Sequence, residues 1–218
     1  MHTLGRRFSC AAFALLSLAA TGAQAANLLS NGSFEAGAFV DNGQHTSSLV
    51  VGSGAMTAWT IIGDTVAWIE TGNPFSLSAN DGARFLDLTD YATGAPFGGV
   101  QQAVATVIGQ SYVLSFDLGS SSLGGRPSAI TATAAASSQT FTSPFTGGSN
   151  DWQTVSMSFV ATSTTTVISL LGSDGVNYIG LDNVVLISAV PEPMSAALWL
   201  AGLAMTSAAV ARRRRHAD

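Results

Sequence analysis

The sequence predicts that residues 26–189 form an all-β domain, an antiparallel β-sandwich. Glycine, serine, threonine and asparagine are frequent there, and few stretches show the period of a helix. Short apolar runs alternate instead with turn residues. The clearest run is Ser111–Leu118, where Tyr112, Leu114 and Phe116 share one face of the expected strand. Many short strands with turns between them are typical of a sandwich.

Nine further strands are expected, separated by turn signals such as Gly63-Asp64, Asn80-Asp81-Gly82 and Gly109-Gln110. A turn is also expected at Ser137-Ser138, and the polar tract Ser163–Thr166 is expected to be a turn rather than a linker. The sequence shows no internal repeat. The expected strands are residues 58–62, 66–69, 84–88, 100–107, 130–136, 139–145, 153–161, 167–171 and 178–187.

The first 25 residues have the pattern of a secretory signal peptide. Arg6-Arg7 supplies the basic region, Phe8–Ala20 the apolar region and Ala23–Ala25 a small-x-small cleavage site. The alternative, a retained anchor, is disfavoured because the apolar region is short for a membrane span. Cys10 is the only cysteine and leaves with the signal, so the mature chain is expected to have no disulfide and no thiolate chemistry.

The C-terminal segment, residues 190–218, has the pattern of a membrane anchor. A stiff Val-Pro-Glu-Pro sequence at 190–193 precedes the uncharged apolar run 194–211. As a helix this run would be about 27 Å long, enough to span a bilayer core. The arginines at 212–215 would hold its end in the cytoplasm. The alternative is a buried helix of a soluble domain, which an arginine cluster at its end disfavours.

These C-terminal residues resemble a PEP-CTERM sorting signal. The residues that carry the resemblance are Val190, Pro191, Glu192, Pro193, Arg212, Arg213, Arg214 and Arg215, with the apolar run between them. The resemblance implies export, transient anchoring in the inner membrane and recognition by an exosortase that cuts near Pro-Glu-Pro. It further implies a final location at the cell surface or outside the cell, in a bacterium that makes extracellular polysaccharide.

Charge is distributed unevenly along the chain. Six of the eight basic residues lie in the two terminal segments. The domain keeps two arginines against eleven carboxylates and has no lysine, a net charge of −9. Because nucleic-acid binding needs a cationic surface, a nucleic-acid partner is excluded. The surplus of carboxylates suits a secreted protein that collects divalent cations.

The order of motifs along the domain resembles the choice-of-anchor C group of exported bacterial proteins. More distantly it is similar to jelly-roll carbohydrate-binding modules of the galactose-binding-like fold. The residues that carry the resemblance are 27–35, 59, 64–69, 81–88, 100–116 and 180–184. Residues 120–150 match no motif. The resemblance implies a jelly-roll fold and an exported location more than an activity.

The domain offers few residues for catalysis, and we expect no enzyme. His45 is its only histidine and lies in the polar stretch Asn42–Ser48 without a visible partner, so it is expected to be a solvated loop residue. A pair of carboxylates could in principle hydrolyse glycosides. No such pair is singled out by the sequence, which leaves a small glycoside hydrolase as the least favoured alternative.

Calcium is the expected cofactor, because it prefers carboxylate, amide and carbonyl oxygens. In the jelly-roll modules that the domain resembles, acidic residues of the first and last strands hold a structural calcium ion. The matching residues are Glu35 and Asp182, with Asn31, Asp87 and Asn183 as secondary candidates. The alternative is that Glu35 and Asp182 only hydrogen-bond the closing strands. The sequence leaves both open.

A carbohydrate site would combine an exposed aromatic platform with carboxylate or amide groups. Trp59 lies in an expected strand, Trp152 directly precedes one, and both are assigned to the core. A core position is also favoured for Trp68. The candidates are Trp68, Phe75, Tyr91 and Phe97 as aromatic groups and Asp90 and Gln102 as hydrogen-bonding groups.

The sequence thus predicts an exported, non-enzymatic domain associated with exopolysaccharide at the cell surface or in the extracellular matrix. Two functions remain open. A structural protein would enter the matrix in bulk and show no saturable ligand. A calcium-stabilised carbohydrate-binding module would recognise a specific glycan.

Overall fold

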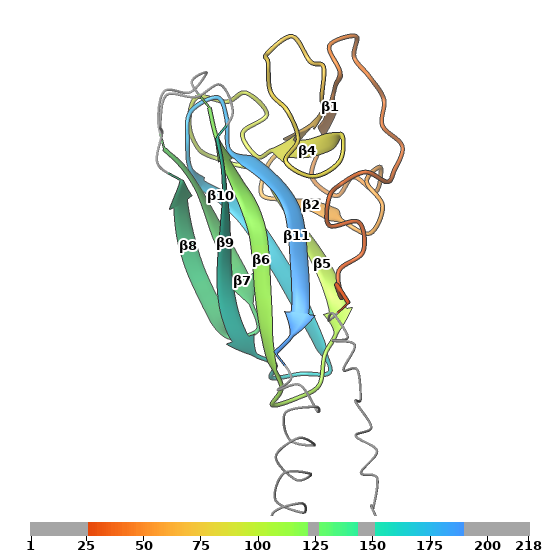
Figure 1. Ribbon diagram of the computed structural model, residues 1–218. Coiled ribbons are helices and arrows are strands. Elements are labelled where there is room, and N and C mark those ends of the chain that lie inside the picture. The colour runs from red at the N-terminus through yellow and green to blue at the C-terminus, as the bar shows by residue number, and fades with distance from the viewer. Residues whose placement is uncertain (1–25, 122–126, 144–150, 190–218) are drawn as a thin grey trace, which may run out of the picture. The chain divides into compact units, whose positions relative to one another are not determined.

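The computed structural model describes residues 26–121, 127–143 and 151–189. These residues form eleven β-strands and contain no helix. All strand pairs are antiparallel, and they form two sheets packed face to face (Figure 1). The predicted all-β sandwich is therefore confirmed. The predicted signal peptide, Val-Pro-Glu-Pro motif, membrane span and arginine cluster lie outside the described residues.

The first sheet has six strands in the order β1-β3-β4-β11-β6-β9. The chain's last strand, β11, therefore lies between β4 and β6 in the middle of the sheet. The strands are β1 (Thr46–Leu49), β3 (Val66–Glu70), β4 (Arg84–Asp87), β6 (Ser111–Ser120), β9 (Asp151–Val160) and β11 (Gly180–Ser188).

The second sheet has five strands in the order β2-β5-β10-β7-β8. Its central strand, β10, pairs with β5 on one side and β7 on the other. The strands are β2 (Thr60–Ile62), β5 (Gly99–Ala105), β7 (Ser128–Ala134), β8 (Ser137–Ser143) and β10 (Thr165–Asp174).

The main core lies between the two sheets. The alternation in β6 places Tyr112, Leu114, Phe116 and Leu118 in this core, as the sequence predicts. Their side chains point to one face because successive residues of a strand alternate. Trp59 also belongs to it, as predicted.

A second, smaller apolar cluster covers part of the outer face of the first sheet. Ala67, Ile69 and Phe85 point outward from β3 and β4, where Leu77 and Tyr178 cover them. Partly buried side chains, Trp152 among them, pack around this cluster. The loop between β3 and β4 therefore closes over the sheet, and this determines where the chain's polar groups can meet.

The structure places strands in all ten expected regions and adds one. The added strand is β1, which lies partly in the polar stretch Asn42–Ser48, because pairing with β3 supplies it with backbone partners that a sequence pattern does not show. The expected turn at Ser137-Ser138 is wrong by two residues. The chain turns at Ala135-Ala136, and Ala135 adopts a left-handed φ of 51°.

No helix in the described ranges is long and apolar enough to cross a membrane.

Candidate functional site

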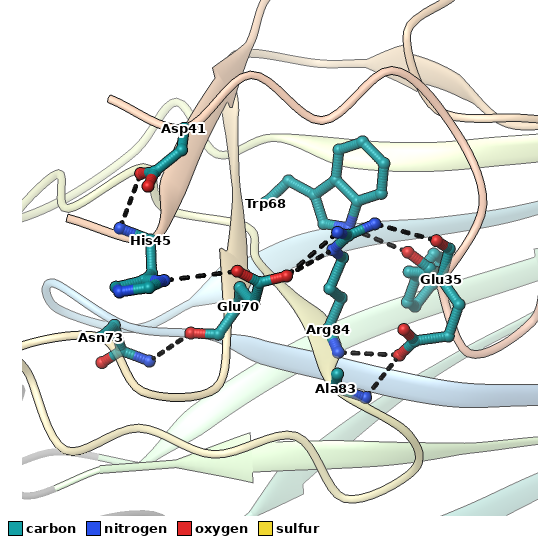
Figure 2. A network of polar contacts seen from close by, with 9 residues as sticks. Glu35, Asp41, His45, Trp68, Glu70, Asn73, Ala83 and Arg84 are labelled. Atoms are coloured by element: carbon teal, nitrogen blue, oxygen red, sulfur yellow. Dashed lines mark hydrogen bonds and ion pairs between the residues drawn. The ribbon is translucent and has the colours of Figure 1, made fainter. Parts of the chain in front are cut away.

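Glu35 and Asp182 hold the same turn, residues 80–84, from two sides. Asp182 Oδ2 accepts hydrogen bonds from the backbone N–H groups of Asn80 (2.8 Å) and Asp81 (2.9 Å). Glu35 Oε1 accepts from the N–H groups of Ala83 and Arg84, both at 2.7 Å (Figure 2). The turn thereby links the segment before the first strand to the last strand.

Gly82 makes this arrangement possible. It adopts a left-handed φ of 72°, and a Cβ atom at this position would lie 2.3 Å from Glu35 Oε1. Only a residue without a side chain allows the carboxylate to approach the backbone so closely. The Asn-Asp-Gly turn signal in the sequence therefore marks a binding position for a carboxylate as well as a turn.

Asp182 faces a second buried aspartate. Asp117 on β6 lies directly opposite Asp182 on β11, and both side chains are fully buried. Asp117 Oδ2 accepts hydrogen bonds from the amides of Asn80 (2.6 Å) and Asn183 (3.0 Å), and Oδ1 accepts one from the Thr154 hydroxyl (2.5 Å). Because donors and neighbouring residues cover both carboxylates, they do not present an acid and base pair to a glycoside.

Burial raises the pKa of Asp182 to about 7, because desolvation outweighs the backbone N–H groups that favour the carboxylate. Those donors belong to Asp81, Asn183 and Asn80. Asp182 therefore changes its charge near neutral pH, in direct contact with the turn.

Arg84 lies beside the Glu35 end of the turn, in a network of aromatic and acidic groups. Its guanidinium lies over the rings of Phe39 (4.6 Å) and Trp68 (5.4 Å). Its Nη1 donates to the backbone carbonyl of Glu35 at 3.0 Å, and Nε and Nη2 donate to Glu70 Oε1 (Figure 2). A partly shielded guanidinium on aromatic faces fixes the geometry of these neighbours.

Glu70 connects Arg84 to His45. His45 Nδ1 lies 3.3 Å from Glu70 Oε2, and the His45 side chain is half exposed. The hydrogen bonds from His45 and then Arg84 lower the pKa of Glu70 below its usual value. The expectation that His45 is an exposed loop residue is confirmed, and its side chain contacts the Glu70 carboxylate.

Asp87, fully buried at the end of β4, organises the next loop. Its Oδ1 accepts from the N–H groups of Thr89 and Ile179, both at 2.9 Å, and its Oδ2 accepts from Tyr91 N at 3.3 Å. Burial raises the pKa of Asp87 to about 6, against the effect of these donors. Asp90 and Tyr91 follow with left-handed φ values of 45° and 67°, which such contacts must stabilise.

This loop brings two of the predicted aromatic residues together at the surface. The rings of Phe75 and Tyr91 lie 5.4 Å apart between centroids at an interplanar angle of 46°. Tyr91 is 36% exposed. Beside it, Asp90 Oδ1 accepts a hydrogen bond from the Ser48 hydroxyl at 2.8 Å. Phe75, Tyr91 and Asp90 are hereafter called the aromatic loop patch.

The other candidates for carbohydrate binding are buried. The core position favoured for Trp68 is confirmed, whereas the expectation that Phe97 forms part of an exposed platform is wrong. Trp68 lies in the core, and its Nε1 donates to the Phe34 carbonyl at 2.9 Å. Phe97 also lies in the core. The Gln102 amide pairs with the backbone N–H and C=O of Ser30. Each polar atom of Trp68 and Gln102 thus satisfies the backbone of the N-terminal segment.

The secondary metal candidates hold backbone and side-chain partners. Asn31 bonds the backbone of Ala36 and Thr57, Asp87 organises the loop described above, and Asn183 donates to Asp117. Within residues 26–121, 127–143 and 151–189, no group of three or more His, Cys, Asp or Glu side chains is arranged to hold a metal ion.

Asp117, Arg84 and Glu70 are the residues that the sequence analysis did not single out for the site. Asp117 carried no signal, because the alternation of the predicted strand places it on the face opposite the core, where a carboxylate is expected in solvent. Arg84 did carry one: it is the only basic residue of the domain besides Arg126, and an isolated cation among eleven acids favours an ion pair.

Several solved structures are similar to this chain. They include "CBM4 structure and function" (16% identity, 73% of this chain, 99% of that chain, TM-score 0.44). A second is TmCBM61 in complex with β-1,4-galactotriose (18% identity, 75% of this chain, 99% of that chain, TM-score 0.46). A third is a family 35 carbohydrate binding module from Clostridium thermocellum (14% identity, 66% of this chain, 99% of that chain, TM-score 0.44). At these identities and scores no ligand or residue role is transferred from them.

No curated protein matches the chain. The family model of DUF642, described as a protein of unknown function, matches residues 27–178. This match includes Glu35, the 80–84 turn and the aromatic loop patch, and it ends before Asp182. The resemblance to the choice-of-anchor C group stays a prediction. Because this match covers more than half of the chain, the chain belongs to the DUF642 family.

Proposed function

We propose that the domain is an exported, non-enzymatic carbohydrate-binding module that associates with extracellular polysaccharide. The observation that carries this proposal is the aromatic loop patch. Its two rings are supplied by different loops, and Asp90 lies next to them with a carboxylate that can accept hydrogen bonds from sugar hydroxyls. Apolar sugar faces stack on aromatic rings while hydroxyls need polar partners, and the patch offers both.

The backbone beneath the patch supports this proposal. Tyr91 N is held by Asp87 Oδ2 at 3.3 Å and Thr89 Oγ1 at 3.0 Å, which fixes the ring's attachment point. Burial raises the pKa of Tyr91 to about 12, so its hydroxyl stays protonated at physiological pH. A ring fixed before the ligand arrives loses less conformational entropy on binding.

Tyr91→Ala is expected to weaken binding to a glycan selected on an array of residues 26–189. The expected loss is about tenfold, since removing one stacking ring costs on the order of 1 kcal/mol or more. Affinity is measured by calorimetry with the selected oligosaccharide. Val167→Ala, which truncates an exposed apolar side chain of β10, is the matched control and should bind normally. Unchanged binding by Tyr91→Ala would contradict the site, and an array without any saturable ligand would favour the structural alternative.

The proposed location follows from the two terminal segments. A signal peptide at 1–25 exports the chain, and the apolar run 194–211 anchors it in the inner membrane until an exosortase cuts near Pro191–Pro193.

Intact-mass measurement of surface material should therefore show a chain without Arg212–Arg215. Glu192→Ala should leave the full-length form in the inner membrane, because the apolar run still inserts. Released protein that keeps the arginine cluster would contradict the sorting proposal.

Calcium at Glu35 and Asp182 is the proposed structural cofactor. Five backbone N–H groups already donate to the two carboxylates, three to Asp182 and two to Glu35. A carboxylate has about four acceptor positions, so each side chain keeps capacity for a cation. Further oxygens would have to come from water or backbone carbonyls, since calcium takes six to eight. Bound calcium would hold Asp182 in its charged form.

A further inference from the structure

We propose that one end of the sandwich rests on the lipid bilayer while the chain is anchored. This end consists of the β5–β6 turn (106–110), the β9–β10 turn (161–164) and the end of β11, which lie together at the bottom of Figure 1. It is called the anchor-side end below. The inference rests on the proposed membrane anchoring but not on carbohydrate binding.

The anchor-side end carries exposed apolar side chains at its tip. Val107 and Ile108 in the β5–β6 turn are 62% and 63% exposed, and Val160 at the end of β9 is 51% exposed. The neighbouring backbone is well fixed, because Gly109 N donates to Ala161 O (2.8 Å) and Ala161 N to Gln110 O (3.0 Å). The turn therefore exposes these apolar side chains at a fixed position, where they can contact another surface.

The chain leaves the described domain at the same end. Ala189 N donates to the Ser111 carbonyl at 2.9 Å, and the Gln110 amide contacts the Ser188 hydroxyl. Only four residues separate Ala189 from the apolar run 194–211. Even fully extended, they reach about 17 Å. An inserted run would therefore hold the anchor-side end near the membrane surface by chain connectivity alone.

The lack of charged side chains at the anchor-side end also fits contact with a membrane surface. Residues 105–111, 160–165 and 187–189 contain no charged side chain, although the domain carries eleven carboxylates. In the first sheet, Asp117 and its partner Asp182 lie six residues along β6 from Ser111, a distance of about 20 Å. An anionic leaflet repels carboxylates and accepts apolar side chains at its interface. A bilayer is therefore the occupant that fits an uncharged apolar tip beside a membrane anchor.

The test uses single-cysteine labels in the full mature chain, residues 26–218, which contains no natural cysteine. Ile108→Cys and Val107→Cys receive an environment-sensitive fluorophore, and the protein is reconstituted into phosphatidylethanolamine–phosphatidylglycerol vesicles. Val40→Cys is the control, because Val40 is 71% exposed but neighbours Asp41. We expect nitroxide-bearing lipids to quench both tip labels several-fold more than the Val40 label, and aqueous iodide to show the opposite order.

Flotation of the same vesicles separates this inference from the anchoring on which it rests. Protein that fails to float would contradict anchoring. Protein that floats with tip labels as open to iodide as the Val40 label would overturn the bilayer contact while anchoring stands. Tip labels shielded from both quenchers would also overturn it, because they would indicate a protein contact at this end. Thermal unfolding of each labelled variant verifies that the domain is intact.

Discussion

Gly82→Ala is expected to lower the free energy of unfolding by about 3 kcal/mol. An alanine Cβ would lie 2.3 Å from Glu35 Oε1 in a residue with a left-handed φ of 72°. The left-handed conformation costs roughly 1–2 kcal/mol for a residue with a Cβ, and displacing the carboxylate adds a similar amount. For a domain of this size the melting temperature should fall by roughly 10 °C. Thermal and urea unfolding of residues 26–189 measure both quantities.

Two other glycines separate the two contributions. Gly52 has a φ of 78° but no atom within 4 Å of an added Cβ, so Gly52→Ala should show only the conformational part, about 1 kcal/mol. Gly94 has open space and no left-handed φ, and Gly94→Ala should change stability by less than about 0.5 kcal/mol. If Gly82→Ala were no more harmful than Gly52→Ala, Glu35 would not hold the turn.

Lowering the pH from 8 to 5, without calcium, is expected to raise the free energy of unfolding by about 2–4 kcal/mol. Burial raises the folded-state pKa of Asp87 to about 6 and of Asp182 to about 7. In the unfolded chain both carboxyls titrate near 4. The folded state therefore binds more protons between pH 4 and 7, and stability falls as the pH rises through this window. Urea unfolding at a series of pH values measures the slope.

Asp182→Asn and calcium distinguish the contributions to this slope. The amide cannot titrate, so Asp182→Asn should remove about 2 kcal/mol of the pH dependence and leave the part due to Asp87. Calcium at a hundredfold excess over its Kd should stabilise the wild type by about 2.7 kcal/mol at pH 8 and flatten the slope. Magnesium, which demands octahedral geometry, should substitute poorly. Equal effects of both ions would contradict the calcium site, and a flat wild-type profile without calcium would contradict the raised pKa values.

The strands and the main core were predictable because each depends on a local pattern. The alternation from Ser111 to Leu118 identifies β6 and its buried face, since successive side chains of a strand point to opposite sides. The Asn80-Asp81-Gly82 turn was likewise marked by its residue types. The pairing of Glu35 with Asp182 through this turn could be anticipated only from the family resemblance, because 147 positions separate the two in the chain.

Tertiary structure decided which polar and aromatic side chains reach the surface. Trp68, Phe97 and Gln102 lie in the interior. The sequence favoured this position only for Trp68, and it did not distinguish Phe97 from Phe75 and Tyr91. A strand buried on both faces, such as β3 with its pattern Val-Ala-Trp-Ile, lacks the alternation that would show which side is covered. Whether the outer face of β3 is buried depends on the loop between β3 and β4, whose Leu77 packs against Ala67 and Ile69.

The sequence by itself determined the two terminal patterns from which targeting is predicted, the acidic charge and the all-β class, because composition and short-range spacing encode them. The opposition of Asp117 and Asp182, the contact of Arg84 with Glu70 and Glu35, and the position of Tyr91 depend on strand order and register. Register is a property of pairs of strands distant in sequence, and burial sets the pKa of a carboxyl only after those pairs have formed.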